Sequence, residues 1–255
     1  MARQLGLYTD NFYHIFNRGA LKREIFLDDG DYFRWVKLMY WCLRYNYSLS
    51  KFLSRVDFMR RTGEDSGQVE KEIAKFYSLP QRPVEMIAWV LMPNHFHLVL
   101  KQLVEAGISS FMHRLTSSYS HYFNRKYEGT GTLFQGRFRA VLVDTEEQFL
   151  HLCRYVHINP LSAGLASRQT LPDYSWSSFR YYMMGKDDLV TTREYLESYF
   201  PSIRLLGEFT LAGSVNQEAY LIEGLTIDDD FGWYEEKRAC EKIRRDNLIE
   251  EVFKA

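Results

Sequence analysis

The sequence has few cysteines and no long hydrophobic run. Its cysteines, Cys42, Cys153 and Cys240, are far apart, and none shows the CxxC spacing of a thiolate zinc site. An odd number of widely spaced cysteines also gives no disulfide framework. No apolar stretch reaches the length of about 20 residues that a membrane-spanning helix needs. The segment from Met1 to Gly6 lacks the apolar core of a signal peptide, so we expect a cytoplasmic protein that does not enter a membrane.

The chain has no strong excess of positive or negative charge. It also has no internal repeats and no low-complexity segments. Its 32 Lys and Arg residues nearly balance 33 Asp and Glu residues. This balance gives no global indication of nucleic-acid binding, although a local basic face can still bind phosphates. Apolar and aromatic residues are abundant, at 46% and 16% of 255 residues, and support a substantial core. The length allows one large domain, or one domain with a smaller appendage.

An apolar run from Val84 to Leu100, interrupted by Pro93-Asn94, predicts a buried β-hairpin. Proline fixes its φ angle and lacks an N–H donor, which puts the turn at this dipeptide. His95 and His97 open the second strand, where side chains two apart share a face. Two such imidazoles can bind one divalent metal ion, but their spacing does not select among Zn, Mn and Mg. For an isolated His-x-His pair, two half-buried histidines bonded to backbone carbonyls are the better explanation, so a metal site needs further groups elsewhere.

The segments before the hairpin predict a strand, an extended stretch, a helix and an insertion. The strand covers Phe12 to Phe16, and the extended stretch covers Leu21 to Leu27. Asp31 is the expected N-cap of a helix that reaches about Tyr45. Residues 47–80 predict a helical insertion of two short helices around a polar loop.

A helix and a strand after the hairpin are rich in bases and aromatic residues. The helix is expected to begin at Ser109 or Ser110 and to reach about Tyr127, and the strand covers Leu133 to Val143. Bases clearly outnumber acids here and alternate with Tyr and Phe. This combination suits a nucleic-acid strand, since cations bind phosphates and flat rings stack on bases. An ordinary amphipathic helix followed by an edge strand explains the pattern equally well.

A further helix is predicted from its N-cap, Thr145, to about Ile158, where Asn159-Pro160 is expected to end it. Tyr155 and Asn159 are four residues apart, so they lie one above the other on the helix surface. A phenol and an amide oxygen arranged in this way can reach one metal site together. By itself, a core tyrosine near a C-capping asparagine is the stronger explanation of this pair.

The remainder of the chain predicts short elements. Residues 174–179 are expected to cap the domain, and residues 193–199 to form a small helix. Residues 201–227 predict one or two helices. Asp228 to Ala255 predict a charged helix of mixed signs, which does not indicate a DNA-binding tail.

Four segments are distinctive when they are taken together and in this order: Tyr13–Gly19, Met92–Leu98, Gly131–Phe138 and Arg154–Leu165. Together they resemble the REP-associated tyrosine transposases, the single-tyrosine branch of the HUH nucleases related to insertion-sequence transposases. The resemblance covers residues 8–185, and the joint occurrence of the segments is far more specific than His-x-His alone. Residues 47–80 depart from the pattern, because such proteins usually have a short connection there.

The resemblance implies an α+β fold, a ferredoxin-like sandwich with a central antiparallel sheet, a helical insertion and a helical C-terminal extension. It divides the chain into a transposase domain of residues 1–185 and an extension of residues 186–255. It implies a divalent metal, Mg or Mn, bound by His95 and His97 with Asn159 as a further ligand. Tyr155 matches the nucleophile of the family.

The function implied is cleavage and rejoining of single-stranded DNA near hairpins through a 5′-phosphotyrosine intermediate, in DNA transposition or REP-element mobilisation. The expected partner is single-stranded DNA with a hairpin or palindromic element, bound by a monomer or a homodimer. Six cations are the expected nucleic-acid contacts: Arg18, Arg114, Arg125, Lys126, Arg137 and Arg139.

Other tyrosines and histidines compete for these roles. The rival tyrosines are Tyr119, Tyr122 and Tyr127. The family pattern and the spacing to Asn159 favour Tyr155. His157 lies away from the Tyr155 face of the helix and is expected to be structural, whereas His151, one turn earlier, is a second-layer alternative that we do not favour.

Two other functions stay open. A non-catalytic nucleic-acid-binding domain on the same fold would bind hairpins without cleaving them. A small-molecule metal hydrolase using the histidine pair would have no basic, aromatic-lined surface beside the metal.

Overall fold

The computed structural model describes residues 6–213. Its four strands form one antiparallel sheet in the order β2-β3-β1-β4. The strands are β1 (Phe12–Arg18), β2 (Val84–Met92), β3 (His95–Gln102) and β4 (Arg139–Val143). Two long helices, α1 (Asp29–Arg44) and α4 (Gly107–Lys126), connect β1 to β2 and β3 to β4. This βαββαβ connectivity and strand order form a ferredoxin-like α+β sandwich, which confirms the predicted fold class.

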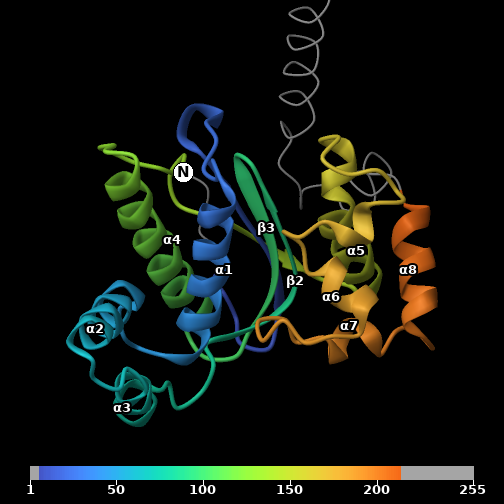
Figure 1. Cartoon of the computed structure of the whole chain (residues 1–255). Coiled ribbons are helices and arrows are strands. Elements are labelled where there is room, and N and C mark those ends of the chain that lie inside the picture. Colours follow the sequence, from blue (N-terminus) through green and yellow to red (C-terminus); the bar gives the residue numbers. More distant parts are fainter. Residues whose placement is uncertain (1–5, 214–255) are drawn as a thin grey trace, which may run out of the picture.

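The two faces of the sheet carry different helices. Figure 1 shows α1 and α4 on one side, and α5 (Glu146–Ser162), α6 (Phe179–Met184) and α8 (Ile203–Ala212) on the other. Side chains alternate along β3, so Phe96 packs in the core under α1 and α4, whereas Val99 packs in the core under α5. His95 and His97 have the same parity as Val99 and therefore lie on the α5 side.

The predicted hairpin is confirmed. Met92 pairs with His95, so Pro93-Asn94 forms the turn between β2 and β3. The outer edge of β2 is covered by the segment that was predicted to cap the domain. Leu91 N donates to Trp176 O at 2.8 Å, and Ser178 N donates to Trp89 O at 2.9 Å. These bonds occupy backbone groups that an exposed sheet edge would leave open for pairing with another chain.

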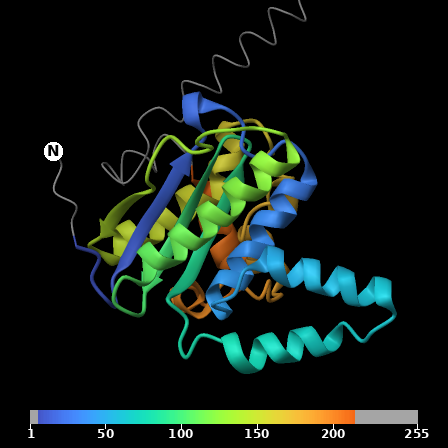
Figure 2. The same cartoon turned by 90° about the vertical axis from the view of Figure 1, so that its left-hand side faces the viewer.

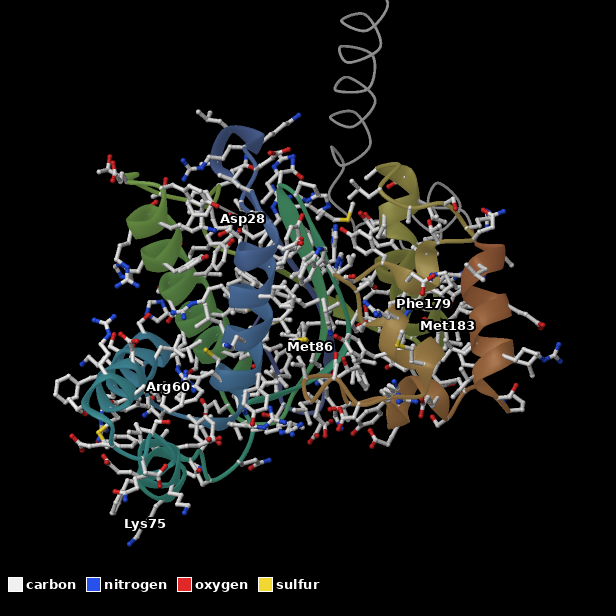
Figure 3. The ribbon with its side chains drawn as sticks, viewed as in Figure 1. Asp28, Arg60, Lys75, Met86, Phe179 and Met183 are labelled. Carbon is white, nitrogen blue, oxygen red and sulfur yellow. The ribbon has the colours of Figure 1, made fainter. Side chains whose placement is uncertain are left out.

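The segment predicted as a helical insertion forms α2 (Leu49–Thr62) and α3 (Gly67–Tyr77). The pair projects from the body of the molecule in Figure 2. Arg55 joins the two helices through hydrogen bonds of 3.0 and 2.7 Å to the Glu72 carboxylate. Figure 3 shows Arg60 and Lys75 on these helices, far from α6, where Phe179 lies.

The prediction of an extended stretch from Leu21 to Leu27 is wrong. A short 3-10 turn, η1 (Ala20–Lys22), stands there, and the φ angles of Leu21 and Lys22 are 55° and 60°. Long-range bonds set this path, because Gly19 N donates to Asn94 O at 2.8 Å and Ala20 N donates to Leu133 O at 2.9 Å. The chain therefore folds back over the β2–β3 turn.

Two predicted N-caps are also wrong. Asp28 caps α1, since its carboxylate accepts from Asp31 N at 3.1 Å, while Asp31 lies buried in the first turn. Helix α4 begins at Gly107, before Ser109, and its N-cap residue, Ala106, has a left-handed backbone (φ 55°) and no capping side chain. Asp28 therefore caps α1 through a local contact, whereas the first turn of α4 is bonded to Gln102, whose side-chain oxygen accepts from Ile108 N at 3.1 Å.

The strand predicted from Leu133 is shorter than expected. Only Arg139–Val143 form β4, while Phe134 makes an isolated bridge to Gly19. Gly136 has a φ of 136°, which interrupts regular strand geometry.

Helix α5 begins as predicted but continues past its expected end. Thr145 caps it, because its hydroxyl accepts from Gln148 N at 3.1 Å. The helix runs through Pro160 to Ser162, which corrects the expected stop. The proline lies in the last turn, so its missing N–H removes a hydrogen bond only near the helix end. Asn159 is consequently a regular helical residue.

The last described elements are η2 (Leu171–Asp173), α7 (Glu194–Glu197) and α8. Helix α8 packs against α5, and Arg154 of α5 donates to Phe209 O at 3.0 Å. The domain boundary at residue 185 stays a prediction, and the charged helix predicted for residues 228–255 lies outside the described residues. Across residues 6–213, no helix has both the length and the apolar character needed to cross a bilayer.

Candidate active site

His95 and His97 lie together on the α5 side of the sheet. Both side chains are buried, and their ring centroids are 5.0 Å apart with the planes nearly perpendicular, at 86°. An imidazole nitrogen binds a metal ion at about 2 Å. At this ring separation both histidines can therefore reach a single ion.

Helix α5 brings Tyr155 to these histidines. The Tyr155 ring is fully buried, and its centroid lies 5.5 Å from that of His97, at 85° between the planes. Leu152 and Val156 pack on the same side of the sheet and hold the helix there. Asn159 is 2% exposed and lies one turn after Tyr155 on the same helix. The structure thus joins side chains from two segments that the sequence separates by about 60 residues.

Asn94 orients the His95 ring. The Asn94 side-chain nitrogen donates to Lys22 O at 3.3 Å, so its oxygen faces His95 Nδ1 at 2.6 Å. That oxygen can only accept, and His95 Nδ1 must therefore carry the proton. In the neutral ring, Nε2 then has the lone pair that a metal ligand needs.

His14 is a member of this cluster that the sequence analysis did not single out. Its Nε2 lies 2.9 Å from His97 Nδ1, and the two rings stack at 5.1 Å and 20°. Its centroid is also 6.2 Å from that of Tyr155. The available signal was a histidine inside the apolar strand predicted for residues 12–16. The local sequence does not reveal which strand His14 faces.

The donor set fits a divalent metal ion with open coordination positions. Imidazole nitrogens suit Mn, Zn and similar ions. The buried Asn159, one turn after Tyr155, is the residue whose amide oxygen would be added as a further ligand. Within residues 6–213, no group of three or more His, Cys, Asp or Glu residues could hold a metal ion. Oxygen atoms of Asn159 and of a bound substrate would therefore have to complete the coordination begun by His95 and His97.

Two of the six predicted nucleic-acid contacts lie on the face of the sheet that carries the histidines. Arg18 stands opposite His95 in the β1–β3 register, and Arg139 stands opposite Phe16 in the β1–β4 register. Directly paired residues of antiparallel strands point to the same face. The exposed Arg137 lies in the loop that leads into β4.

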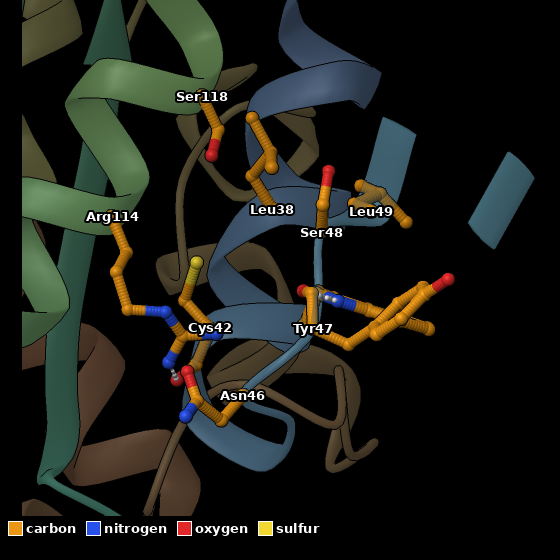
Figure 4. A pocket seen from close by; sticks show the side chains of 9 residues that line it. Leu38, Cys42, Asn46, Tyr47, Ser48, Leu49, Arg114 and Ser118 are labelled. Carbon is orange, nitrogen blue, oxygen red and sulfur yellow. Dashed lines mark hydrogen bonds between the residues drawn. The ribbon is translucent and has the colours of Figure 1, made fainter. Parts of the chain in front are cut away.

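The other three cations lie on α4, across the sheet from Tyr155. Arg114 donates to the carbonyl oxygens of Cys42 and Tyr45 beside a cavity of about 170 Å³, shown in Figure 4. Lys126 bonds to Asp28 and Asp31, and Arg125 is exposed on the same helix. The structure does not bring Arg114, Arg125 and Lys126 to the histidine cluster, and their predicted contact with DNA stays a prediction.

The rival tyrosines also lie on the α4 side. Tyr119 donates to Ile25 O at 2.5 Å, while Tyr122 and Tyr127 donate to the Asp31 carboxylate at 3.0 and 2.7 Å. Burial raises the pKa of the Tyr119 and Tyr122 phenols, which opposes formation of a phenolate. Among the four tyrosines considered, Tyr155 is the one beside the histidines.

The remaining two histidines of α5 point elsewhere. His157 packs on the rings of Phe179 and Tyr182, and its Nε2 lies 2.9 Å from Ser178 Oγ. His151 pairs with Arg154 at 2.9 Å on the side that faces α8. His157 is therefore a packing residue, as expected.

Burial of His157 makes stability fall in acid. Burial lowers the pKa of His157 to about 3, whereas an unfolded histidine titrates near about 6.5. Between these values the unfolded chain binds a proton that the native chain does not, so unfolding becomes easier as pH falls. We expect His157 to contribute a loss of about 1.4 kcal/mol of unfolding free energy for each pH unit below about 6.

Urea unfolding from pH 7.5 to 4.5 measures this slope. His157→Phe should flatten the profile by about one proton equivalent, whereas substitution of the exposed His113 by Gln should leave it unchanged. Equal slopes in the parent and in His157→Phe would show that His157 is not the titrating group.

Two comparisons with known proteins find similarity to transposases. The family model described as "Transposase IS200 like" matches residues 60–159, which include the hairpin histidines, Tyr155 and Asn159. The resemblance to insertion-sequence transposases that the sequence predicts is confirmed over this span. A solved structure described as a REP-associated tyrosine transposase bound to a REP hairpin is similar at 18% identity and a TM-score of 0.47, over 74% of this chain and 88% of that one. The comparison with curated proteins gives no match. The family match supports a transposase-like function on DNA.

Proposed function

We propose that this chain is a metal-dependent tyrosine transposase that cleaves and rejoins single-stranded DNA near a hairpin. The observation that supports this proposal most is that Tyr155, His95 and His97 lie together in one buried cluster. A phenol beside two metal-binding imidazoles combines a nucleophile with a site that can stabilise negative charge. The matched family span contains all three residues.

The proposed reaction is a transesterification at phosphorus. A divalent ion on His95, His97 and Asn159 would draw charge from the scissile phosphate when bound. The Tyr155 oxygen attacks phosphorus and loses its proton, and the bond from phosphorus to the 3′ oxygen breaks. The 3′ oxygen takes up a proton and leaves as a hydroxyl, while the 5′ phosphate stays joined to Tyr155.

The covalent intermediate explains how strands can be rejoined. A phosphotyrosine ester keeps the energy of the broken phosphodiester, so a 3′ hydroxyl can attack it and release Tyr155. With one tyrosine at the site, one DNA end is held covalently at a time. The domain from residue 1 to 185 is proposed to carry this chemistry, and residues 186–255 to extend it.

The path of DNA follows from the cations on the site face. Arg18 stands opposite His95 and is half-buried. Arg139 is exposed on β4, and β1 lies between β4 and the strand that carries the histidines. We propose that Arg18, Arg139 and Arg137 contact the phosphates next to the scissile bond. Because Tyr155 and His97 are fully buried, the site must open for DNA to reach the phenol.

Metal removal tests the proposed function. The whole chain is incubated with single-stranded DNA that carries palindromic hairpins, with Mg or Mn, and separated on a denaturing gel. We expect a protein–DNA adduct that disappears when the metal is chelated and that is lost in His97→Ala but retained in His113→Ala, an exposed histidine on α4.

Two outcomes would contradict parts of the proposal. An adduct that forms equally well with excess chelator would exclude the metal at His95 and His97. Hairpin binding without an adduct, over a panel of hairpins and both metals, would favour the non-catalytic binding domain instead.

A further inference from the structure

We propose that His14 is a positioning residue that fixes the tautomer and orientation of His97. In this role His14 Nε2 accepts a hydrogen bond from His97 Nδ1–H, which leaves Nε2 of His97 as its metal-binding nitrogen. The inference rests on the proposed metal site and deepens it by naming a residue outside the predicted ligand set.

The contact between the two rings is direct and shielded from water. His14 Nε2 and His97 Nδ1 are 2.9 Å apart, and the rings stack at 20°. Both side chains have no exposed surface. A hydrogen bond in such an environment is not exchanged with solvent, so it holds its partners more firmly than the same bond at the surface.

The direction of this bond decides whether His97 can bind a metal. A neutral imidazole carries one N–H, and a metal binds the other nitrogen. With the proton on Nδ1, His97 presents a lone pair at Nε2. With the bond reversed, Nε2 would carry the proton and could not bind an ion.

His95 shows the same arrangement with a different partner. Its Nδ1 donates to the Asn94 oxygen at 2.6 Å, which assigns Nε2 as the metal-binding nitrogen. Both candidate ligands thus have Nδ1 held by a neighbour, at 2.6 and 2.9 Å. Outer partners of this kind set the orientation of metal-binding histidines, and their loss weakens metal binding by about 10–100-fold.

Strand pairing explains why His14 is positioned for this role. His97 pairs with Phe16 across β1 and β3, and His14 is the diagonal neighbour two residues away on the same face. The rings of Phe16 and Tyr155 also lie against His97, at centroid distances of 6.0 and 5.5 Å. The His97 ring is therefore enclosed, and His14 supplies the polar contact that selects its tautomer.

Binding of Mn²⁺ to the whole chain without DNA tests the inference. The electron paramagnetic resonance signal of free Mn²⁺ measures how much of the ion is bound. In His14→Phe the ring is kept and the acceptor is lost, so we expect affinity to fall at least about 10-fold. In His14→Gln the side-chain oxygen can stand where Nε2 stood, so affinity should stay within about 3-fold of the parent. Thermal melting of each variant checks that it is folded.

Nitrogen NMR of the parent chain gives a second measurement that needs no variant. Without metal, at a pH where the rings are neutral, His97 should appear as the Nδ1–H tautomer. An Nε2–H tautomer, or equal Mn²⁺ affinity in the parent and His14→Phe, would overturn the role of His14. A His14→Gln variant as weak as His14→Phe would overturn the acceptor argument.

The failure of this inference is distinguishable from failure of the proposed function. If the parent forms a metal-dependent adduct while His14→Phe binds Mn²⁺ normally, only the role of His14 is wrong. If the parent binds no Mn²⁺ and forms no adduct, the metal site itself is wrong, and the role of His14 falls with it.

Discussion

Tyr155→Phe is expected to abolish the covalent protein–DNA adduct while the protein stays folded. The substitution removes the oxygen that attacks phosphorus, so no ester to residue 155 can form. It keeps the ring that packs beside His97 and His14 at centroid distances of 5.5 and 6.2 Å. We expect adduct formation to fall at least about 1,000-fold, as for other enzymes that lose their nucleophile, measured on denaturing gels with the hairpin DNA that the parent cleaves.

Tyr122→Phe is the matched control, because it removes a phenol oxygen on the opposite side of the sheet. The Tyr122 hydroxyl donates to Asp31 at 3.0 Å. Its loss should lower the free energy of unfolding by about 0.5–1.5 kcal/mol and leave the adduct intact. Parental adduct levels in Tyr155→Phe would refute the assignment of the nucleophile. Loss of the adduct only in Tyr122→Phe would move the assignment to Tyr122.

The elements that the sequence predicted best are those determined by local signals. The Pro93-Asn94 turn follows from the missing N–H and fixed φ of proline, and the strands beside it from continuous apolar runs. The start of α5 follows from Thr145, whose hydroxyl caps the helix. Because Tyr155 and Asn159 lie on that helix, their common face was also predictable.

The parts that the sequence did not predict depend on contacts between distant residues. The turn at Leu21 and Lys22 is set by backbone bonds to Asn94 and Leu133, which no local pattern reveals. The role of His14 depends on the register of β1 against β3. A single residue of slip would turn His14 to the opposite face of the sheet.

The predicted cations lie on both sides of the sheet, and contacts between distant residues again determine which side each one joins. Arg18 and Arg139 share a face with the histidines because of antiparallel pairing, whereas Arg114 and Lys126 lie on a helix that packs on the other face. Arg114, Lys126 and Arg139 come from one segment in which bases outnumber acids, and composition does not show which layer each base joins. The pairing of Lys126 with Asp31 gives that lysine a structural contact instead.

Asp31→Asn is expected to produce the largest loss of stability among single polar substitutions on the α1–α4 side. The Asp31 carboxylate has no exposed surface and accepts hydrogen bonds at 2.7 to 3.0 Å from Leu27 N, Tyr122, Lys126 and Tyr127. An amide has one acceptor oxygen, and its NH₂ group would face donors. Because this leaves buried donors without acceptors and removes one of the two carboxylates that pair with Lys126, we expect a loss of about 2–4 kcal/mol.

The melting temperature of Asp31→Asn is expected to fall by about 4–16 °C, since each kcal/mol corresponds to about 2–4 °C for a chain of this size. Asp29→Asn is the control, because Asp29 is exposed in the same first turn and contributes through the helix dipole, worth less than about 1 kcal/mol. Lys126→Met should also destabilise, and the double variant should lose less than the sum of the two single losses, because the two residues share one ion pair. Full stability of Lys126→Met together with weaker DNA binding would contradict this assignment and support a contact between Lys126 and DNA.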